Sequence, residues 1–123
     1  GLLGGGAVLL CAISGGAAAV APALTSMPGA AAGTAALPLA AAGQIHLAGF
    51  AQDFDAAGDL LLIDSHGAPI AQAVWDLYRF TLERTGPLPT LTERDNDIPA
   101  FAVLLAEAKK AENMLHMKEG MAA

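Results

Sequence analysis

Charge divides this chain into two unlike parts. No aspartate, glutamate, lysine or arginine occurs before Asp53, so all six basic and all twelve acidic residues lie in the remainder. Residues 1–43 consist mainly of alanine, glycine, leucine and proline, and no helical or strand period persists through them. We therefore expect an Ala/Gly-rich low-complexity segment there, distinct from the domain that follows.

Two other interpretations of residues 1–43 stay open. One is a set of buried apolar barrel segments, and the other is a membrane span or secretory signal in the run up to about Ala21. The many glycines weaken the membrane interpretation, and the basic residues that begin a secretory signal are missing. We expect a cytoplasmic chain without membrane attachment.

Length and composition exclude several classes of protein. The 123 residues suffice for one domain, whereas a complete eight-stranded βα barrel needs about 250. The net charge of −6 and the lack of clustered basic residues argue against a nucleic-acid partner. The single cysteine, Cys11, cannot form an internal disulfide, and its apolar surroundings favour an inert buried thiol.

The second part of the chain alternates strand-like and helix-like segments. Short apolar runs predict strands, and apolar residues at helical spacing predict amphipathic helices. The expected elements are a strand at 44–49, an acidic loop at 53–58, a buried strand at 60–64, a helix at 69–85, a strand at 89–93 and a helix beginning near Pro99. This alternation predicts an α/β fold with parallel, buried strands.

The last helix is expected to have a polar cap and one buried face. Asn96 or Asp97 is suited to cap it, because both side chains accept hydrogen bonds from the first helical amides. Its apolar residues share one face at helical spacing. They are Phe101, Leu104, Leu105, Ala108 and Leu115.

Polar residues end three predicted strands, where parallel α/β folds place their ligand sites. His46 points to the opposite side of its strand from its apolar neighbours. Asp64 and His66 are two residues apart, so an extended chain would direct both to one side. With Glu93 after the third strand, they offer the nitrogen and oxygen ligands of a mixed metal site.

Each of these residues also has a structural alternative. A lone strand histidine such as His46 is more often a satisfied core residue than a ligand. Asp64 can instead hydrogen-bond the backbone of a turn, with His66 merely exposed, and spacing alone does not decide between the two. Asp95 repeats the two-residue spacing after Glu93, and its role stays undecided.

Three stretches resemble a known enzyme family. They read Ile-His-Leu-Ala-Gly from Ile45, Leu-Ile-Asp-Ser-His-Gly-Ala-Pro from Leu62, and Pro-Leu-Pro-Thr-Leu-Thr-Glu-Arg-Asp from Pro87. In order and spacing they resemble the C-terminal portion of the multinuclear non-haem iron-dependent oxidative enzymes. The best-known type of this largely uncharacterised family is the methanobactin-biosynthesis oxidase. The similarity runs from about Pro38 to about His116.

The resemblance implies a TIM barrel that holds two or three iron ions. It implies oxygen-dependent oxidation of cysteine residues in a ribosomally made precursor peptide, and a partner protein that delivers this peptide. Matched position by position, His46, Asp64 and His66 correspond to metal ligands of the family. Glu93 corresponds to a glutamate ligand that bridges metals, and no organic cofactor is implied.

The chain also departs from the family pattern. Many members have a histidine where this chain has Phe50, and further family ligands would fall near Gly15 to Ala18, which carry no ligand atoms. The ligands of the front half of the barrel are absent. We therefore expect residues 44–116 to be the C-terminal part of a TIM-barrel-like metal-binding domain, with residues 117–123 as a tail.

Two alternatives to an oxidase fragment remain. One is a non-catalytic remnant or interaction module, whose apolar N-terminal segment packs on a partner or a membrane and whose exposed apolar surface promotes self-association. The other is a mononuclear hydrolase that uses the same ligands with an open coordination position.

Overall fold

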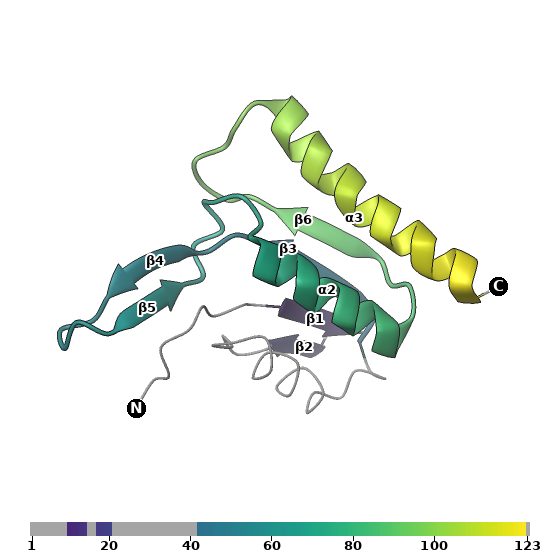
Figure 1. Cartoon of the computed structure of the whole chain (residues 1–123), viewed down its shortest axis with the longest axis horizontal. Helices are drawn as coiled ribbons and strands as arrows, with labels where there is room; N and C mark the ends of the chain where they lie inside the picture. The colour runs from purple at the N-terminus through teal and green to yellow at the C-terminus, as the bar shows by residue number, and fades with distance from the viewer. Residues whose placement is uncertain (1–9, 15–16, 21–41, 123) are drawn as a thin grey trace.

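The computed structural model describes residues 10–14, 17–20 and 42–122 (Figure 1). Its elements are β1 (Leu10–Ser14), β2 (Ala17–Val20), β3 (Gln44–Ala48), β4 (Ala51–Phe54), β5 (Leu60–Ile63), α2 (Gln72–Thr85), β6 (Thr90–Glu93) and α3 (Phe101–Ala122). Most of the predicted low-complexity segment lies outside the described residues, although β1 and β2 fall within it. At the other end, α3 continues through the predicted tail without a break.

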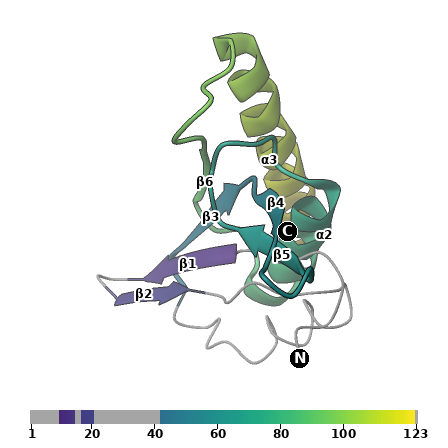
Figure 2. The same cartoon turned by 90° about the vertical axis from the view of Figure 1, so that its left-hand side faces the viewer.

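A four-stranded sheet forms one layer of the structure. Its strand order is β2-β1-β3-β6, with β3 and β6 parallel and the other two pairs antiparallel (Figure 2). The β3–β6 register pairs Ala48 with Glu93, so both strands end at the same edge of the sheet. The strands predicted at 44–49 and 89–93 are therefore parallel, as the alternation of strands and helices predicts.

Helix α2 covers one face of this sheet and supplies most of the core. It contacts β3 and β1, while α3 contacts β6 and α2. The buried side chains meet between α2 and β3, as expected from helical spacing on α2 and alternation on β3. They are Ile45, Leu47, Ile70, Val74, Trp75, Leu77, Tyr78 and Leu82, with Ala111 from α3.

The ends of α2 differ in how well the sequence predicts them. The helix ends at Thr85 and is capped by Gly86, which has φ 73° and donates its amide to the carbonyl of Leu82, in agreement with the predicted stop. It begins at Gln72 rather than near Pro69, because the residues before it form other contacts. Ile70 donates its amide to Glu107 and accepts a hydrogen bond from the indole of Trp75.

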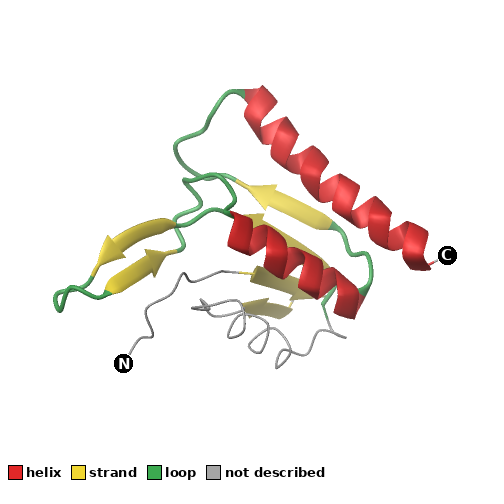
Figure 3. Cartoon of the chain, viewed as in Figure 1, coloured by secondary structure: helices red, strands yellow, loops and turns green. Residues whose placement is uncertain are grey.

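The strand predicted at 60–64 belongs to a different sheet from the one expected. Its residues form β5, which pairs antiparallel with β4 in a two-stranded hairpin that projects from the rest of the chain (Figure 3). The described side chains of this hairpin are not buried as expected, since Ile63 in β5 is 42% exposed and Phe54 at the end of β4 is 67% exposed. A short apolar run is compatible with a buried parallel strand and with one strand of a hairpin. Here the tight turn between β4 and β5 makes it part of a hairpin.

That turn lies in the predicted acidic loop. The side chain of Asp55 accepts hydrogen bonds from the amides of Ala57 and Asp59, and Gly58 adopts φ 85°. An aspartate that bonds the backbone ahead of it, followed by a glycine with positive φ, closes a tight turn between antiparallel strands. The predicted loop therefore contains the end of β4 and a hairpin turn.

Helix α3 also departs from expectation at its start. Neither Asn96 nor Asp97 caps it, since the helix begins at Phe101. The side-chain amide of Asn96 donates instead to the carbonyl of Ser65. Much of its predicted apolar face is exposed, including Phe101 at 74% and Leu105 at 39%. Contact with β6 and α2 covers mainly its middle, where Ala111 is 4% exposed.

The described residues thus form a mixed α/β structure with one parallel strand pair and two helices. This arrangement agrees with part of a βα unit, and a closed TIM barrel is not confirmed by it. Neither of the helices that the structure describes is long and apolar enough to cross a membrane.

Candidate metal centre

His46 lies in the middle of β3, on the face away from the core. Its neighbours Ile45 and Leu47 are fully buried against α2, so alternation directs the imidazole to the other face, as the sequence predicts. The His46 side chain is 14% exposed, and its Nδ1 lies 3.0 Å from Oε1 of Glu93. Its Nε2 is buried and has no hydrogen-bond partner.

Glu93 ends β6 at the edge of the sheet where β3 also ends. While its Oε1 faces His46, its Oε2 lies 3.6 Å from Nδ1 of His66. One carboxylate therefore contacts both predicted histidine ligands. This position follows from the parallel register, which sets the end of β6 beside the end of β3.

Asp64 and His66 follow the β4–β5 hairpin and meet each other, although the chain is not extended between them. Ser65 donates its amide to the carbonyl of Ile63, and His66 has φ 52°, a conformation that few residues other than glycine adopt. The chain therefore forms a turn here, one of the two geometries that spacing alone left open. The side chains still converge, because Nε2 of His66 lies 2.7 Å from Oδ1 of Asp64.

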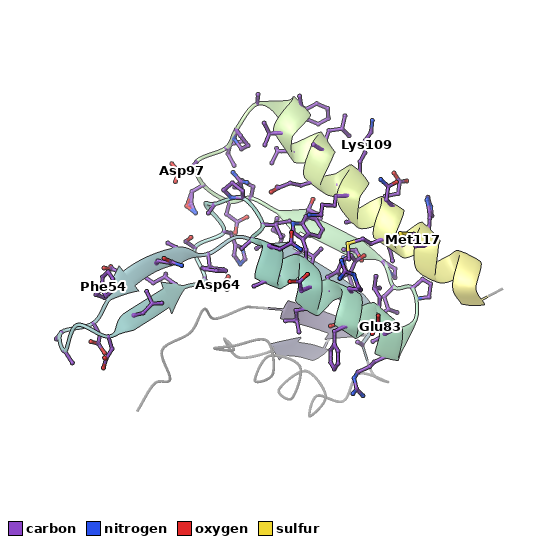
Figure 4. The ribbon with its side chains drawn as sticks, viewed as in Figure 1. Phe54, Asp64, Glu83, Asp97, Lys109 and Met117 are labelled. Carbon is purple, nitrogen blue, oxygen red and sulfur yellow. The ribbon has the colours of Figure 1, made fainter. Side chains whose placement is uncertain are left out.

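Hydrogen bonds from two other loops hold the His66 segment in place. The amide of His66 donates to the carbonyl of Gly49, and the carbonyl of His66 accepts from the amide of Asp95. Asn96 adds a bond from its side chain to the carbonyl of Ser65. In Figure 4, Asp64 lies where the hairpin joins the rest of the chain, below the loop that carries Asp97.

Asp95 is the site residue that the sequence left undecided. Its Oδ2 lies 2.9 Å from Nδ1 of His66 in a hydrogen bond. The repeated two-residue spacing of Glu93 and Asp95 was the available signal, since it places both carboxylates at the same strand end. Spacing alone could not separate this role from that of a solvated capping residue.

The neighbouring carboxylates change the acid–base behaviour of His66. Burial lowers its pKa, but the hydrogen bond to Asp95 and the negative charges of Asp64 and Glu93 outweigh burial, so the pKa is raised above its ordinary value of 6.5. The site therefore favours a positive charge at this position. A metal cation that binds His66 would have to replace the proton.

The donor set suits a metal such as iron by its chemistry. Imidazole nitrogens and carboxylate oxygens are ligands of iron and of other transition metals. Nε2 of His46 is buried and makes no hydrogen bond, so this nitrogen is available to bind a metal. As the side chains lie, however, they pair with one another. In the described part of the chain, no three histidine, cysteine, aspartate or glutamate side chains converge in an arrangement that could hold one ion.

Other residues considered from the sequence lie away from this site or in core positions. Phe50, where the resemblance predicts a histidine in many family members, is partly buried and packs against the hydrophobic core. Asp53, Asp55 and Asp59 belong to the hairpin. Two positions matched to family ligands, residues 15 and 16, lie outside the described residues.

The amino-acid sequence of this chain is similar to curated proteins over 74–80 residues. It is 60% identical over 80 residues to a UPF0276 protein of Caulobacter sp. strain K31, which covers 65% of this chain and 28% of that protein. It is 61% identical over 74 residues to a UPF0276 protein of Bordetella bronchiseptica, covering 60% and 26%. A third relative, a UPF0276 protein of Rhizobium meliloti, is 47% identical over 78 residues, covering 63% and 25%.

The chain spans about a quarter of the length of these curated relatives. No solved structure matches it. The family described as "RiPP precursor modification enzyme MbnB/TglH/ChrH" matches residues 26–116, which include all four predicted ligands and Asp95. The chain therefore belongs to this family of enzymes that modify the precursors of ribosomally made peptides.

Proposed function

We propose that this chain is the C-terminal part of an iron-dependent enzyme that oxidises cysteine residues of a ribosomally made precursor peptide. Family membership supports a precursor peptide as the substrate class. The proposal goes further in naming iron and cysteine. The contact network that links the four predicted ligands is the observation that carries it.

This network joins residues from three separate segments. Asp64 contacts His66, His66 contacts Glu93, and Glu93 contacts His46, at N–O distances of 2.7, 3.6 and 3.0 Å. A cation bound beside these carboxylates would offset the negative charge that they place around His66.

Each residue has a distinct role in this proposal. His46 would bind a metal through Nε2, which makes no hydrogen bond in the structure. Glu93 reaches both histidines with its two oxygens, a position suited to bridging metals. Asp64, with its side chain 46% exposed, would form the solvent-facing side of the site beside His66. Bound iron would supply the redox chemistry, with oxygen as the oxidant of the peptide thiol.

The remaining ligands and the peptide-delivering partner are expected to come from outside the described residues. The relatives are about four times as long as the matched region, which leaves room for both further ligands and a peptide-binding surface. Full activity is therefore a proposal for the whole protein, whereas metal binding can be tested on this chain.

The decisive experiment measures iron and zinc in the chain purified without oxygen and supplied with both metals. We expect iron to copurify with the parent chain and to be lost from His66→Ala. His116→Ala is the matched control, because it removes an exposed histidine of α3, far along the chain from the network. This control should retain the metal.

Each outcome selects one function. Iron in the parent and the control, but not in His66→Ala, supports the oxidase proposal and justifies measuring thiol loss in cysteine-containing peptides. Zinc in place of iron favours a mononuclear hydrolase. Absence of metal from all three proteins contradicts a metal site in this chain and favours the non-catalytic remnant or interaction module.

A further inference from the structure

The hairpin of β4 and β5 has two unpaired edges. Among the described residues its sheet contains these two strands alone, and it projects from the rest of the chain (Figure 3). Phe54 and Ile63 leave apolar surface exposed on it. An edge strand presents unpaired N–H and C=O groups, which can pair with an extended segment of another chain. Since an isolated two-stranded hairpin is only marginally stable in water, a third strand would also stabilise it.

We propose that the outer edge of β5 binds an extended segment of the precursor peptide, which adds to the hairpin as a third strand. The bound segment is apolar in its middle and carries basic residues at its ends. This inference rests on the proposed function for the substrate class, a precursor peptide, and it requires no bound metal.

The hydrogen-bond pattern of the hairpin indicates which backbone groups face outward. Asp55 donates its amide to the carbonyl of Asp59 across the turn, and inward and outward pairs alternate along an antiparallel ladder. The next pair, Phe54 with Leu60, therefore directs its backbone groups to the outer edges. Leu62, two residues further along β5, repeats the orientation of Leu60. The outer edge of β5 thus offers two amides and two carbonyls to a docked strand.

The outer edge of β4 is less suited to pairing. The amide of Phe54 points outward there, but it already donates to Oδ1 of its neighbour Asp53 at 2.8 Å. An edge amide that is bonded to a side chain cannot also donate to a docked strand. Among the hydrogen bonds of the described residues, none is made by the outward amide of Leu60.

Strand β5 leads directly to the candidate metal centre. Its last residue, Ile63, precedes Asp64, and His66 follows two residues later. Asp64 lies where the hairpin joins the rest of the chain (Figure 4). A strand that lies along β5 therefore has one end beside these two predicted ligands. Because a strand advances about 3.3 Å per residue, a cysteine one or two residues beyond that end reaches this centre.

Charge and hydropathy indicate the kind of segment that fits this edge. The apolar strand Leu60–Ile63 lies between Asp59 and Asp64. No lysine or arginine occurs in the chain before Arg79, and further aspartates on β4 and in the turn add negative charge. A short apolar run with a basic residue at each end is complementary to this surface, whereas an acidic peptide is repelled by it.

The test uses a fluorescein-labelled peptide of the sequence Lys-Val-Thr-Val-Thr-Lys with blocked ends, and measures its binding to the full chain by fluorescence anisotropy. One matched peptide is N-methylated at its four central residues, which keeps the side chains and removes the backbone donors. We expect it to bind at least about tenfold more weakly. A second peptide has glutamate in place of both lysines, and we expect no measurable binding.

Two proline variants test which edge is used. Leu60→Pro removes the outward amide at the first residue of β5, a position where proline is tolerated. Gln52→Pro is the matched control, because Gln52 pairs with Leu62 and its amide faces the outer edge of β4. Leu60→Pro should bind the lysine peptide at least about tenfold more weakly than the parent, and Gln52→Pro should match the parent. Circular dichroism checks that both variants fold, and the N-methylated peptide tests the edge without changing the protein.

Several results would overturn the proposal. They are equal binding of the N-methylated peptide, stronger binding of the glutamate peptide, or loss of binding in Gln52→Pro rather than in Leu60→Pro. Sedimentation of the chain without peptide tests another occupant. A parent that is dimeric, together with a monomeric Leu60→Pro, places a second copy of the chain at this edge and overturns a peptide occupant.

The peptide and metal measurements separate this inference from the proposed function. Peptide binding at β5 by a chain that takes up no iron supports the docking edge and contradicts the metal function. Iron uptake by a chain that binds none of the peptides leaves the metal function in place and overturns the docking edge.

Discussion

Gly49 occupies a position where any side chain would collide with backbone. A Cβ atom there would overlap the carbonyl oxygen of Ala68 and lie 2.6 Å from the carbonyl oxygen of Pro69. The carbonyl of Gly49 also accepts the amide hydrogen of His66. The glycine therefore lets the end of β3 approach the segment that carries two predicted ligands.

We expect Gly49→Ala to lower the free energy of unfolding by roughly 1–3 kcal/mol, because backbone atoms must move to admit the methyl group. Urea denaturation followed by circular dichroism measures the change. Gly120→Ala is the control, since nothing lies within 4 Å of its added Cβ and alanine favours a helix. Equal stability of Gly49→Ala and the parent would show that this close approach is not required.

At this scale the sequence identified the ligand candidates but not how they meet. Alternation along β3 correctly placed His46 opposite the core, because a strand has a fixed period of two. Spacing left open whether Asp64 and His66 would converge from an extended chain or lie in a turn, and they converge through a turn with a positive φ at His66. Such geometry depends on hydrogen bonds to residues 49 and 95, which no local pattern reveals.

Glu107 attaches helix α3 to the rest of the structure. Its Oε1 accepts the amide hydrogen of Ile70, and its Oε2 lies 3.5 Å from Nη2 of Arg94. Both side chains are largely buried, at 15% and 5% exposure. The helix is thus tied to the segment before α2 and to the residue that follows Glu93.

We expect Glu107→Ala to destabilise the fold by about 3 kcal/mol, because it leaves the buried Arg94 charge without its partner. Glu107→Gln should lose less stability, since the amide oxygen of glutamine can still accept the hydrogen bond from the backbone amide of Ile70. Glu112→Ala, an exposed acid on the same helix, should change stability by no more than about 0.5 kcal/mol. If urea unfolds Glu107→Ala and Glu112→Ala at the same concentration, the attachment of α3 does not depend on this ion pair.

Among the elements, those with a core contact were predictable and those without were not. Helix α2 and strand β3 share one buried interface, so their periodicity predicted both their types and their buried residues. The apolar run of β5 carried no such information, since Leu60–Ile63 pairs with β4 away from the main sheet. Helix α3 has more apolar residues than β6 and α2 can cover, which explains the exposure of Phe101.

In the residues that the structure describes, two helices pack against the four-stranded sheet. Tyr78 joins helix α2 to this sheet, since its ring is fully buried and its hydroxyl lies 2.8 Å from Oγ1 of Thr90 in β6. The part of the chain that matches the relatives spans about a quarter of their length, so a barrel remains an expectation for the longer protein. Stability of this chain therefore rests on the α2–β3–β6 interface.

Because of Tyr78, we expect the stability of the chain to fall in the alkaline pH range. Burial raises its pKa above the ordinary value of 10.0, and the hydrogen bond with Thr90 only partly offsets this. The folded state thus favours the neutral phenol more than the unfolded state does. Its contribution is fully present below about pH 10, the unfolded pKa, and is lost as pH rises through the higher folded pKa.

This dependence can be measured on one residue, because the chain contains a single tyrosine. Ultraviolet absorbance of the tyrosinate should give a midpoint above 10.0 in native protein and near 10.0 in urea. Unfolding free energies measured at rising alkaline pH should fall more steeply for the parent than for Tyr78→Phe, which has no group to ionise. Identical slopes for the two proteins, or a native midpoint no higher than the unfolded one, would mean that the α2–β6 contact opens to solvent without unfolding the chain.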